Sequence, residues 1–252
     1  MQILGVDLWR IILCAILIFL VVKRANLVAG FAKTNYIKGD YEKSLKIFKV
    51  ANTIGNLSVP NKTLYAYIQL RCGLVEEAQT SIRGILPYTK PRSADRYQLK
   101  NLLALTYWKQ GNLNDAIEEM EEIVADNYKP TQIYQNLGIY YNLSGDMNRA
   151  IKFNVEAYEY NSDDHIICDN LADAYARNGE NEKAAEIYEK MINSDPEPQF
   201  PEAYYGYGKV LIALGEKEKG IEMIEKSLTK PFSYLSIRPK EEIEELLQES
   251  MK

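Results

Sequence analysis

Residues 133–158 read IYQNLGIYYNLSGDMNRAIKFNVEAY, and residues 170–191 read NLADAYARNGENEKAAEIYEKM. With Gly145 aligned to Gly179, the two stretches show the same order of large and small side chains at an interval of 34 residues. Each stretch has apolar residues at helical spacing, then a glycine, then a second helical pattern. A glycine that ends one helix just before another begins predicts two antiparallel helices joined by a tight turn.

The same pattern occurs six times along the chain. Six glycines follow apolar helical stretches at spacings of 34, 38, 34, 34 and 36 residues, namely Gly39, Gly73, Gly111, Gly145, Gly179 and Gly215. A large side chain stands eight residues before each glycine, in the order Phe31, Tyr65, Leu103, Leu137, Leu171 and Tyr207. The next residue is always small, in the order Ala32, Ala66, Ala104, Gly138, Ala172 and Gly208. Recurrence at a fixed interval predicts a stack of similar helix pairs.

Two further columns follow the glycines. Five residues after each glycine stands a second small residue, in the order Ser44, Ala78, Ala116, Ala150, Ala184 and Gly220. Small side chains at both positions let the two helices of a pair approach closely. Large residues nine positions after the glycine are expected to fill the space between pairs, namely Phe48, Ile82, Met120, Tyr188 and Ile224. Asn154 interrupts this column, so we expect looser or rearranged packing there, with Phe153 as a substitute.

These columns resemble the tetratricopeptide repeat, a helix–turn–helix unit of 34 residues. The fourth and fifth units match best, with Tyr134, Leu137, Gly138, Tyr141, Ala150, Ala157, Leu171, Ala172, Tyr175, Ala184 and Tyr188 in register and Pro196 at the closing proline. The first, second and sixth units carry Asn35, Gln69 and Leu211 where the family usually has an aromatic residue. The resemblance implies an all-α, right-handed superhelical solenoid of about six helix-turn-helix repeats. The expected units are residues 25–58, 59–92, 97–130, 131–164, 165–198 and 201–234.

Two segments flank the expected array of residues 25–234. Residues 235–252 are expected to form a C-terminal capping helix with Ile243, Leu246 and Leu247 on its apolar face, because the last pair of an array otherwise exposes its apolar side. Residues 1–24 contain the run LWRIILCAILIFLVV from Leu8 to Val22. As a helix this run is about 22 Å long at ~1.5 Å per residue, against a hydrocarbon core of about 30 Å. We expect a nearly continuous helix from about residue 3 to Lys38.

The N-terminal run is interpreted as a single uncleaved transmembrane helix. Residues 3–6 extend the apolar stretch, Trp9 suits the membrane interface, and Arg10 and Lys23 can reach the headgroups. A cleaved signal peptide and a buried helix of a soluble protein are the competing interpretations. A signal peptide carries its positive charge before its apolar core, whereas here Lys23 and Arg24 follow it. By the positive-inside rule, this basic side and the repeats after it are expected in the cytoplasm.

The charge balance and the cysteine and histidine content of the chain argue against several classes of ligand and reaction. Residues 25–252 contain 27 basic and 34 acidic residues, a negative balance that argues against nucleic acid as a partner. The three cysteines show no C-x-x-C spacing, which excludes a disulfide framework and a zinc ribbon. The chain has a single histidine, His165, and no phosphate-binding loop. We therefore expect no enzyme, no cofactor and no metal site.

In the family that this sequence resembles, the first helices of successive repeats line a groove that binds a partner. The positions ten, six and three residues before each turn glycine lie on one helical face. Among them we select twelve candidate groove residues: Lys33, Tyr36, Thr63, Tyr67, Asn101, Trp108, Gln135, Asn142, Asp169, Asp173, Tyr205 and Lys209. Tyr67 and Trp108 are the expected aromatic anchors, and the amides are expected to bond a peptide backbone.

The resulting hypothesis is a membrane-anchored adaptor that binds a partner protein or peptide in its groove. Two alternatives share the fold. One is an extracytoplasmic envelope assembly factor with the opposite orientation in the membrane, and the other is a repeat protein that assembles with copies of itself. The lysine and asparagine set with which some family members hold a C-terminal carboxylate is incomplete here, because no second lysine follows Lys33 in the groove set of the next repeat.

Overall fold

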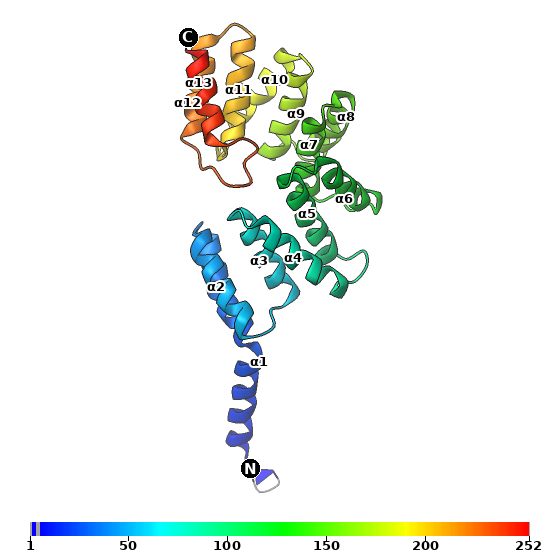
Figure 1. The fold of residues 1–252 in the computed structure, drawn as a ribbon, viewed down its shortest axis with the longest axis vertical. Coiled ribbons are helices and arrows are strands. Elements are labelled where there is room, and N and C mark those ends of the chain that lie inside the picture. The colour runs from blue at the N-terminus through cyan, green and yellow to red at the C-terminus, as the bar shows by residue number, and fades with distance from the viewer. Residues whose placement is uncertain (1, 4–5, 252) are drawn as a thin grey trace. The chain divides into compact units, whose positions relative to one another are not determined.

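The computed structural model describes residues 2–3 and 6–251 and is almost entirely helical. Contacts divide the chain into two compact units, residues 1–99 and 100–252, and the boundary falls within one helix. We describe each unit by itself, as unit 1 and unit 2 (Figure 1).

Unit 1 contains two short strands, four helices and a 3-10 turn. The elements are β1 Gln2–Ile3, β2 Val6–Asp7, α1 Leu8–Ile37, α2 Tyr41–Ile54, α3 Val59–Arg71, α4 Val75–Ile85 and η1 Leu86–Tyr88. The strands pair antiparallel, α1 packs along α2, and α3 packs along α4. Helix α2 is capped by Asp40, whose side chain accepts a hydrogen bond from the Lys43 amide.

Unit 2 contains the rest of α5 and eight further helices. Their bounds are α5 Ala94–Lys109, α6 Leu113–Ala125, α7 Thr131–Ser144, α8 Met147–Tyr160, α9 His165–Arg177, α10 Asn181–Ile192, α11 Pro201–Ala213, α12 Lys217–Leu228 and α13 Lys240–Ser250. Each helix from α6 to α13 packs on the next in the chain, and α9 also contacts both α7 and α11. The helices α7, α9 and α11 therefore lie in one row, which we name the first-helix face.

The turns between paired helices depend on glycine. All six glycines aligned in the sequence have a positive φ, between 79° and 88°. Residues with a Cβ rarely adopt this backbone conformation, which explains why glycine recurs at each turn. The predicted tight turn is confirmed at all six glycines, and its backbone is left-handed there.

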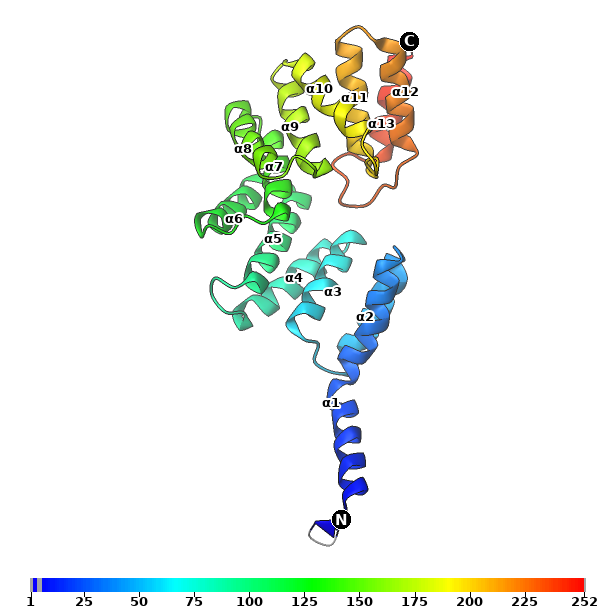
Figure 2. The ribbon, with the colours of Figure 1, turned by 180° about the vertical axis from the view of Figure 1, so that it is seen from behind.

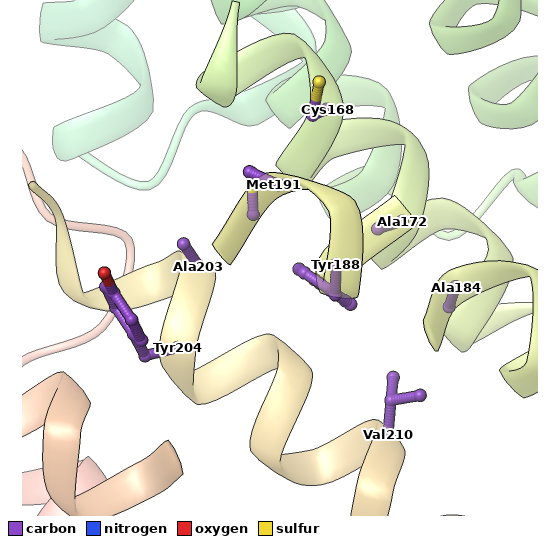
Figure 3. Packing of buried hydrophobic residues seen from close by; sticks show 8 residues of the cluster. All are labelled: Cys168, Ala172, Ala184, Tyr188, Met191, Ala203, Tyr204 and Val210. Atoms are coloured by element: carbon purple, nitrogen blue, oxygen red, sulfur yellow. The ribbon is translucent and has the colours of Figure 1, made fainter. Parts of the chain in front are cut away.

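The columns of side-chain size correspond to packing positions. Every residue of both small columns is buried, and so are Phe48, Ile82, Met120, Tyr188 and Ile224 of the large column. Figure 3 shows one such core, to which α9, α10 and α11 contribute eight side chains. Phe31, by contrast, is 69% exposed, because α1 belongs to the first pair and no earlier pair covers that side of it.

Asn154 replaces apolar packing with a polar network. Its side chain is fully buried, and its Nδ2 donates to Asn142 Oδ1 at 2.9 Å. Space for this arrangement comes from Gly138, where an added Cβ would stand 2.3 Å from Asn154 Oδ1 and 2.7 Å from Asn170 Nδ2. Packing is thus rearranged at this position through asparagine side chains, and Phe153 packs instead on Tyr134 and Tyr141.

The N-terminal helix differs at its start from the sequence-based expectation. Helix α1 begins at Leu8 and not near residue 3, because residues 2–3 and 6–7 pair as strands and Asp7 is a residue type that favours the position before a helix. The first half of α1 extends beyond α2, as both views show (Figures 1 and 2). Residues 9–24 are exposed, and within the part of the chain that the structure describes this is the one helix long and apolar enough to span a membrane or to act as a signal sequence.

Helix α13 caps the C-terminal end of unit 2. Ile243 is 1% exposed and packs with Tyr205 and Ile224, and Leu246 and Leu247 lie against the same cluster. The capping helix and its three apolar residues are therefore confirmed as predicted.

Candidate functional site

A cavity of about 350 Å³ opens on the first-helix face of unit 2. Its walls come from α7, α9, α10 and α11, and from the loop of residues 229–239 that joins α12 to α13. Five of the predicted groove residues line it: Asn142, Asp169, Asp173, Tyr205 and Lys209. The positions ten, six and three residues before the glycines thus converge on one cavity over three successive first helices.

The polar side chains of the cavity are held in fixed orientations. The amide of Asn142 is 2% exposed and donates to the Asn170 carbonyl oxygen at 2.8 Å and to Asp173 Oδ2 at 3.0 Å. Arg177 Nε lies 2.7 Å from the same Asp173 oxygen, one helical turn along α9. Asp173 is therefore compensated by a cation and an amide before any ligand arrives.

Asp169 is buried in the cavity lining and, among the described residues, has no ion pair. Its side chain is 5% exposed, and its hydrogen-bond donor is the hydroxyl of Tyr188, itself 1% exposed. Burial, together with the nearby carboxylates of Asp173 and Glu202, raises the pKa of Asp169 well above its usual range, against the opposing effect of the Tyr188 hydroxyl and of Arg177. The cavity thus contains a carboxylate whose charge is poorly compensated.

The loop of residues 229–239 folds back across unit 2 and forms part of the cavity wall. The Ile237 amide donates to Glu202 Oε1 at 2.7 Å, and the guanidinium carbon of Arg238 lies 5.2 Å from the centroid of the Tyr205 ring. Lys109, at the end of α5, donates from Nζ to the Ser236 carbonyl oxygen at 2.9 Å. Burial lowers the pKa of Lys109 to about 8, although Glu202 opposes this shift.

Three other predicted groove residues make contacts within the protein. Asn101 is 7% exposed and accepts a hydrogen bond from Asn136 Nδ2 at 2.7 Å, and Gln135 donates to the carboxylate of Asp164. The Trp108 ring packs against Tyr140, with centroids 5.8 Å apart. Asn101 and Gln135 thus have partners that join successive helices, so replacing them would disturb the fold as well as any groove.

The remaining four predicted residues lie in unit 1. The rings of Tyr36 and Tyr67 meet edge to face with centroids 6.2 Å apart, and the Tyr67 hydroxyl accepts from Arg71 at 3.3 Å. Thr63 donates to the carbonyl oxygen of its own helix at Val59, and Lys33 is half-buried on α1. Tyr36 and Tyr67 thus form an aromatic pair between α1 and α3.

Sequence reasoning missed several residues of the cavity. Arg177 lies four residues after Asp173, and Glu202 lies three residues before Tyr205. The helical spacing used to select the groove residues, extended by one turn, would therefore have identified both. Ile237 and Arg238 had no such signal, because repeat periodicity says nothing of where an intervening loop folds. Among residues 2–3 and 6–251, no group of three or more His, Cys, Asp or Glu side chains is arranged to hold a metal ion.

We expect Asp169→Asn to stabilise the protein near neutral pH. The folded-state pKa of Asp169 lies above the unfolded value of about 3.9. The free energy of unfolding therefore falls as the pH rises from the unfolded-state pKa through the folded-state pKa, because the buried carboxyl group resists ionisation. An asparagine oxygen can still accept from Tyr188 and carries no charge. A gain of ~1 kcal/mol raises Tm by roughly 2–4 °C in a domain of 150–250 residues.

The measurement is thermal unfolding of the parent chain and Asp169→Asn across pH. The Tm difference should grow as the pH rises from the unfolded-state pKa of about 3.9 to the folded-state pKa, and it should vanish well below the unfolded-state pKa, where Asp169 is protonated in both states. A Tm difference that does not change with pH would show that the carboxylate is already compensated.

These features define a class of protein: a helical-repeat solenoid with a polar cavity on the face of its first helices. Models of the tetratricopeptide repeat match residues 101–164, 167–202 and 201–229. The chain is also 30% identical over 137 residues to the TPR repeat-containing protein YvcD of Bacillus subtilis (strain 168). That match covers 54% of this chain but only 28% of YvcD. The chain belongs to the tetratricopeptide repeat family.

Solved structures share the fold. A tetratricopeptide repeat protein from Parabacteroides merdae superposes with a TM-score of 0.73 over 91% of this chain and 85% of that chain, at 19% identity. PilW, a type IV pilus biogenesis factor, gives a TM-score of 0.66 over 81% of this chain and 92% of its own, at 17% identity. A thermophilic TPR protein from Thermus thermophilus gives 0.62 over 77% and 99%, at 16% identity. At these identities the likeness establishes the solenoid fold alone.

Proposed function

We propose that this chain is a membrane-anchored adaptor that holds a segment of a partner protein on the first-helix face of unit 2. The observation that carries this proposal is the cavity, where groove positions from α7, α9 and α11 meet around buried polar side chains. Solenoids of stacked helix pairs commonly bind partners on the surface that their successive helices create. Proteins of the matched family generally act as scaffolds for protein interactions, which agrees with this function.

The cavity has the features expected of a recognition site. Its lining mixes apolar side chains with amide, carboxylate and basic groups, so apolar contacts can provide binding energy while the polar groups fix orientation. Asn142 and Asp173 are already positioned by internal hydrogen bonds, so binding a partner there costs little side-chain entropy. A mouth open to solvent at Ala213 and Lys209 allows a side chain of an extended segment to enter.

The anchor in this proposal is the exposed first half of α1. Its apolar side chains from Trp9 to Val22 are exposed in the part of the chain that the structure describes, and exposing so long an apolar helix to water is unfavourable. Lys23, Arg24 and Lys33 follow this segment, which favours a cytoplasmic position for the repeats. The adaptor would then concentrate its partner at the inner surface of the membrane.

We expect Ala213→Trp to block partner binding by filling the mouth of the cavity. Ala213 is exposed and lines the cavity, so a tryptophan there obstructs entry without breaking an internal contact. The test selects peptides from a random phage library with the full chain in lipid nanodiscs, using empty nanodiscs for counter-selection. Selected peptides should bind Ala213→Trp at least tenfold more weakly than the parent chain.

Ala125→Trp is the matched control. Ala125 is also exposed and lies at the end of α6, outside the cavity, so this variant should bind the selected peptides as the parent chain does. Failure to enrich any peptide over empty nanodiscs, or equal binding by Ala213→Trp, would remove the cavity from the proposed function.

A further inference from the structure

The cavity of unit 2 contains apolar side chains beside a buried carboxylate. Six apolar side chains line it, namely Ile139, Leu143, Ala176, Val210, Ala213 and Ile237. Asp169 lies among them, 5% exposed, with the Tyr188 hydroxyl as its donor. A ligand that fits such a site needs an aliphatic stem and a terminal group that satisfies a carboxylate.

The cations that line the cavity leave Asp169 uncompensated. Among the residues that the structure describes, no Lys, Arg or His side chain forms an ion pair with the Asp169 carboxylate. Arg177 is paired with Asp173 at 2.7 Å, and Arg238 is paired with Glu242 of α13. Lys209 is exposed and lies with its Nζ 5.6 Å from the Tyr205 ring centroid.

A buried carboxylate without a cation is unfavourable for the free protein. When one partner of a buried ion pair is removed, the remaining charge still bears its desolvation cost but has no counter-ion to offset it. The Asp169 carboxylate is in this situation. Groups of this kind in a cavity are typical of binding sites, where the ligand supplies the missing charge. The Tyr205 ring in the cavity wall is already in contact with cations of this chain, since the Arg238 guanidinium carbon lies 5.2 Å from its centroid.

We propose that the cavity takes a lysine or arginine side chain of the partner segment, with Asp169 as its counter-ion and the apolar walls packing along its aliphatic stem. This inference rests on the proposed function and adds the residue type that the site selects. Lysine and arginine fit because their long methylene stems pack on apolar surface while their charged ends reach a polar group. A carboxylate ligand would be repelled by Asp169, and the cavity cations Arg177 and Arg238 already pair with carboxylates of this chain.

The proposal makes partner binding dependent on pH. The charged groups around Asp169 are Asp173 and Arg177 from α9, Glu202 and Lys209 from α11, Tyr188 from α10 and Arg238 from the loop. Because the pKa of Asp169 is raised, a cationic side chain that binds below this pKa must displace the proton of the carboxyl group. Affinity for a basic peptide should therefore rise with pH across the folded-state pKa of Asp169, and this rise should be absent in Asp169→Asn.

The test repeats the phage selection with the full chain in nanodiscs, as the parent chain, Asp169→Asn and Asp163→Asn. Asp163 is an exposed carboxylate outside the cavity and provides the matched control. The parent chain and Asp163→Asn should enrich lysine or arginine at one fixed peptide position, and Asp169→Asn should lose this preference. In a synthetic peptide, replacing that basic residue by methionine should weaken binding at least tenfold to the parent chain and less than twofold to Asp169→Asn.

The outcomes separate this inference from the proposed function. Peptides that are enriched without a basic residue at any fixed position would overturn the inference and leave the adaptor function standing. The same holds for a methionine replacement that weakens binding to both proteins equally. Failure to enrich any peptide would count against the proposed function itself. Asp169→Asn is expected to be at least as stable as the parent chain, so lost binding in this variant does not arise from unfolding.

Discussion

Gly208→Ala is expected to lower the thermal stability of the chain strongly. An added Cβ at position 208 would stand 2.6 Å from the Gly220 carbonyl oxygen and 2.7 Å from Ile224 Cγ1. The oxygen belongs to the backbone of α12, so α11 and α12 would have to separate. Overpacking of this kind costs about 3 kcal/mol, which lowers Tm by roughly 6–12 °C in a domain of 150–250 residues.

Gly84→Ala is the matched control for this prediction. An added Cβ at Gly84 in α4 meets no atom within 4 Å, and alanine is favoured over glycine in helices by about 0.5–1 kcal/mol. Thermal unfolding followed by circular dichroism should therefore show a slight rise in Tm for Gly84→Ala and a marked fall for Gly208→Ala. A Tm for Gly208→Ala within a degree or two of the parent value would mean that the two helices tolerate a wider separation.

Replacing Ile16 and Phe19 by aspartate is expected to release the protein from membranes. Both side chains are exposed in the apolar part of α1, at 49% and 56%. An aspartate near the centre of a membrane-spanning helix costs about 3 kcal/mol, so two of them outweigh the favourable transfer of several apolar side chains. Fractionation of cells that express the full chain should show the parent in the membrane fraction and the double variant in the soluble fraction.

Phe31→Asp controls for a general effect of charge on α1. Phe31 is 69% exposed but lies beyond Lys23 and Arg24, outside the expected span, so this variant should stay with the membrane. Mass spectrometry of the intact protein separates the remaining interpretation, since loss of residues before Lys23 would identify a cleaved signal sequence. A parent chain found wholly in the soluble fraction would contradict the anchor.

The repeat architecture was predictable because its causes are local and recur. Each turn needs a residue that adopts the left-handed backbone conformation, and each close approach of paired helices needs a small side chain. The residue types and the spacing of Gly145 and Ala150 therefore indicate their structural roles. Asn154 broke the column, and its partners could not be predicted, because the network depends on the space left by Gly138 and on asparagines from neighbouring helices.

The candidate site was only partly predictable. Helical spacing identified Asp169 and Tyr205 on one face, because the first helices repeat. Spacing does not reveal that Asn101 in α5 accepts a hydrogen bond from Asn136 in α7, since that depends on which side chain α7 presents. The position of Arg238 in the cavity lining could not be predicted from the sequence, because the loop that carries it is irregular and has no repeating pattern.

The loop of residues 229–239 has a mechanical consequence for unit 2. In most repeat proteins each repeat contacts only its neighbours, so the array can bend and extend through small changes between successive repeats. Here the bond from Lys109 to Ser236 joins residues that are 127 positions apart, from the first helix of the unit to the segment before its last. Stretching unit 2 along the stack of helices must break this hydrogen bond. Unit 2 should therefore resist a force applied at its two ends until the bond breaks, and its length should then increase abruptly.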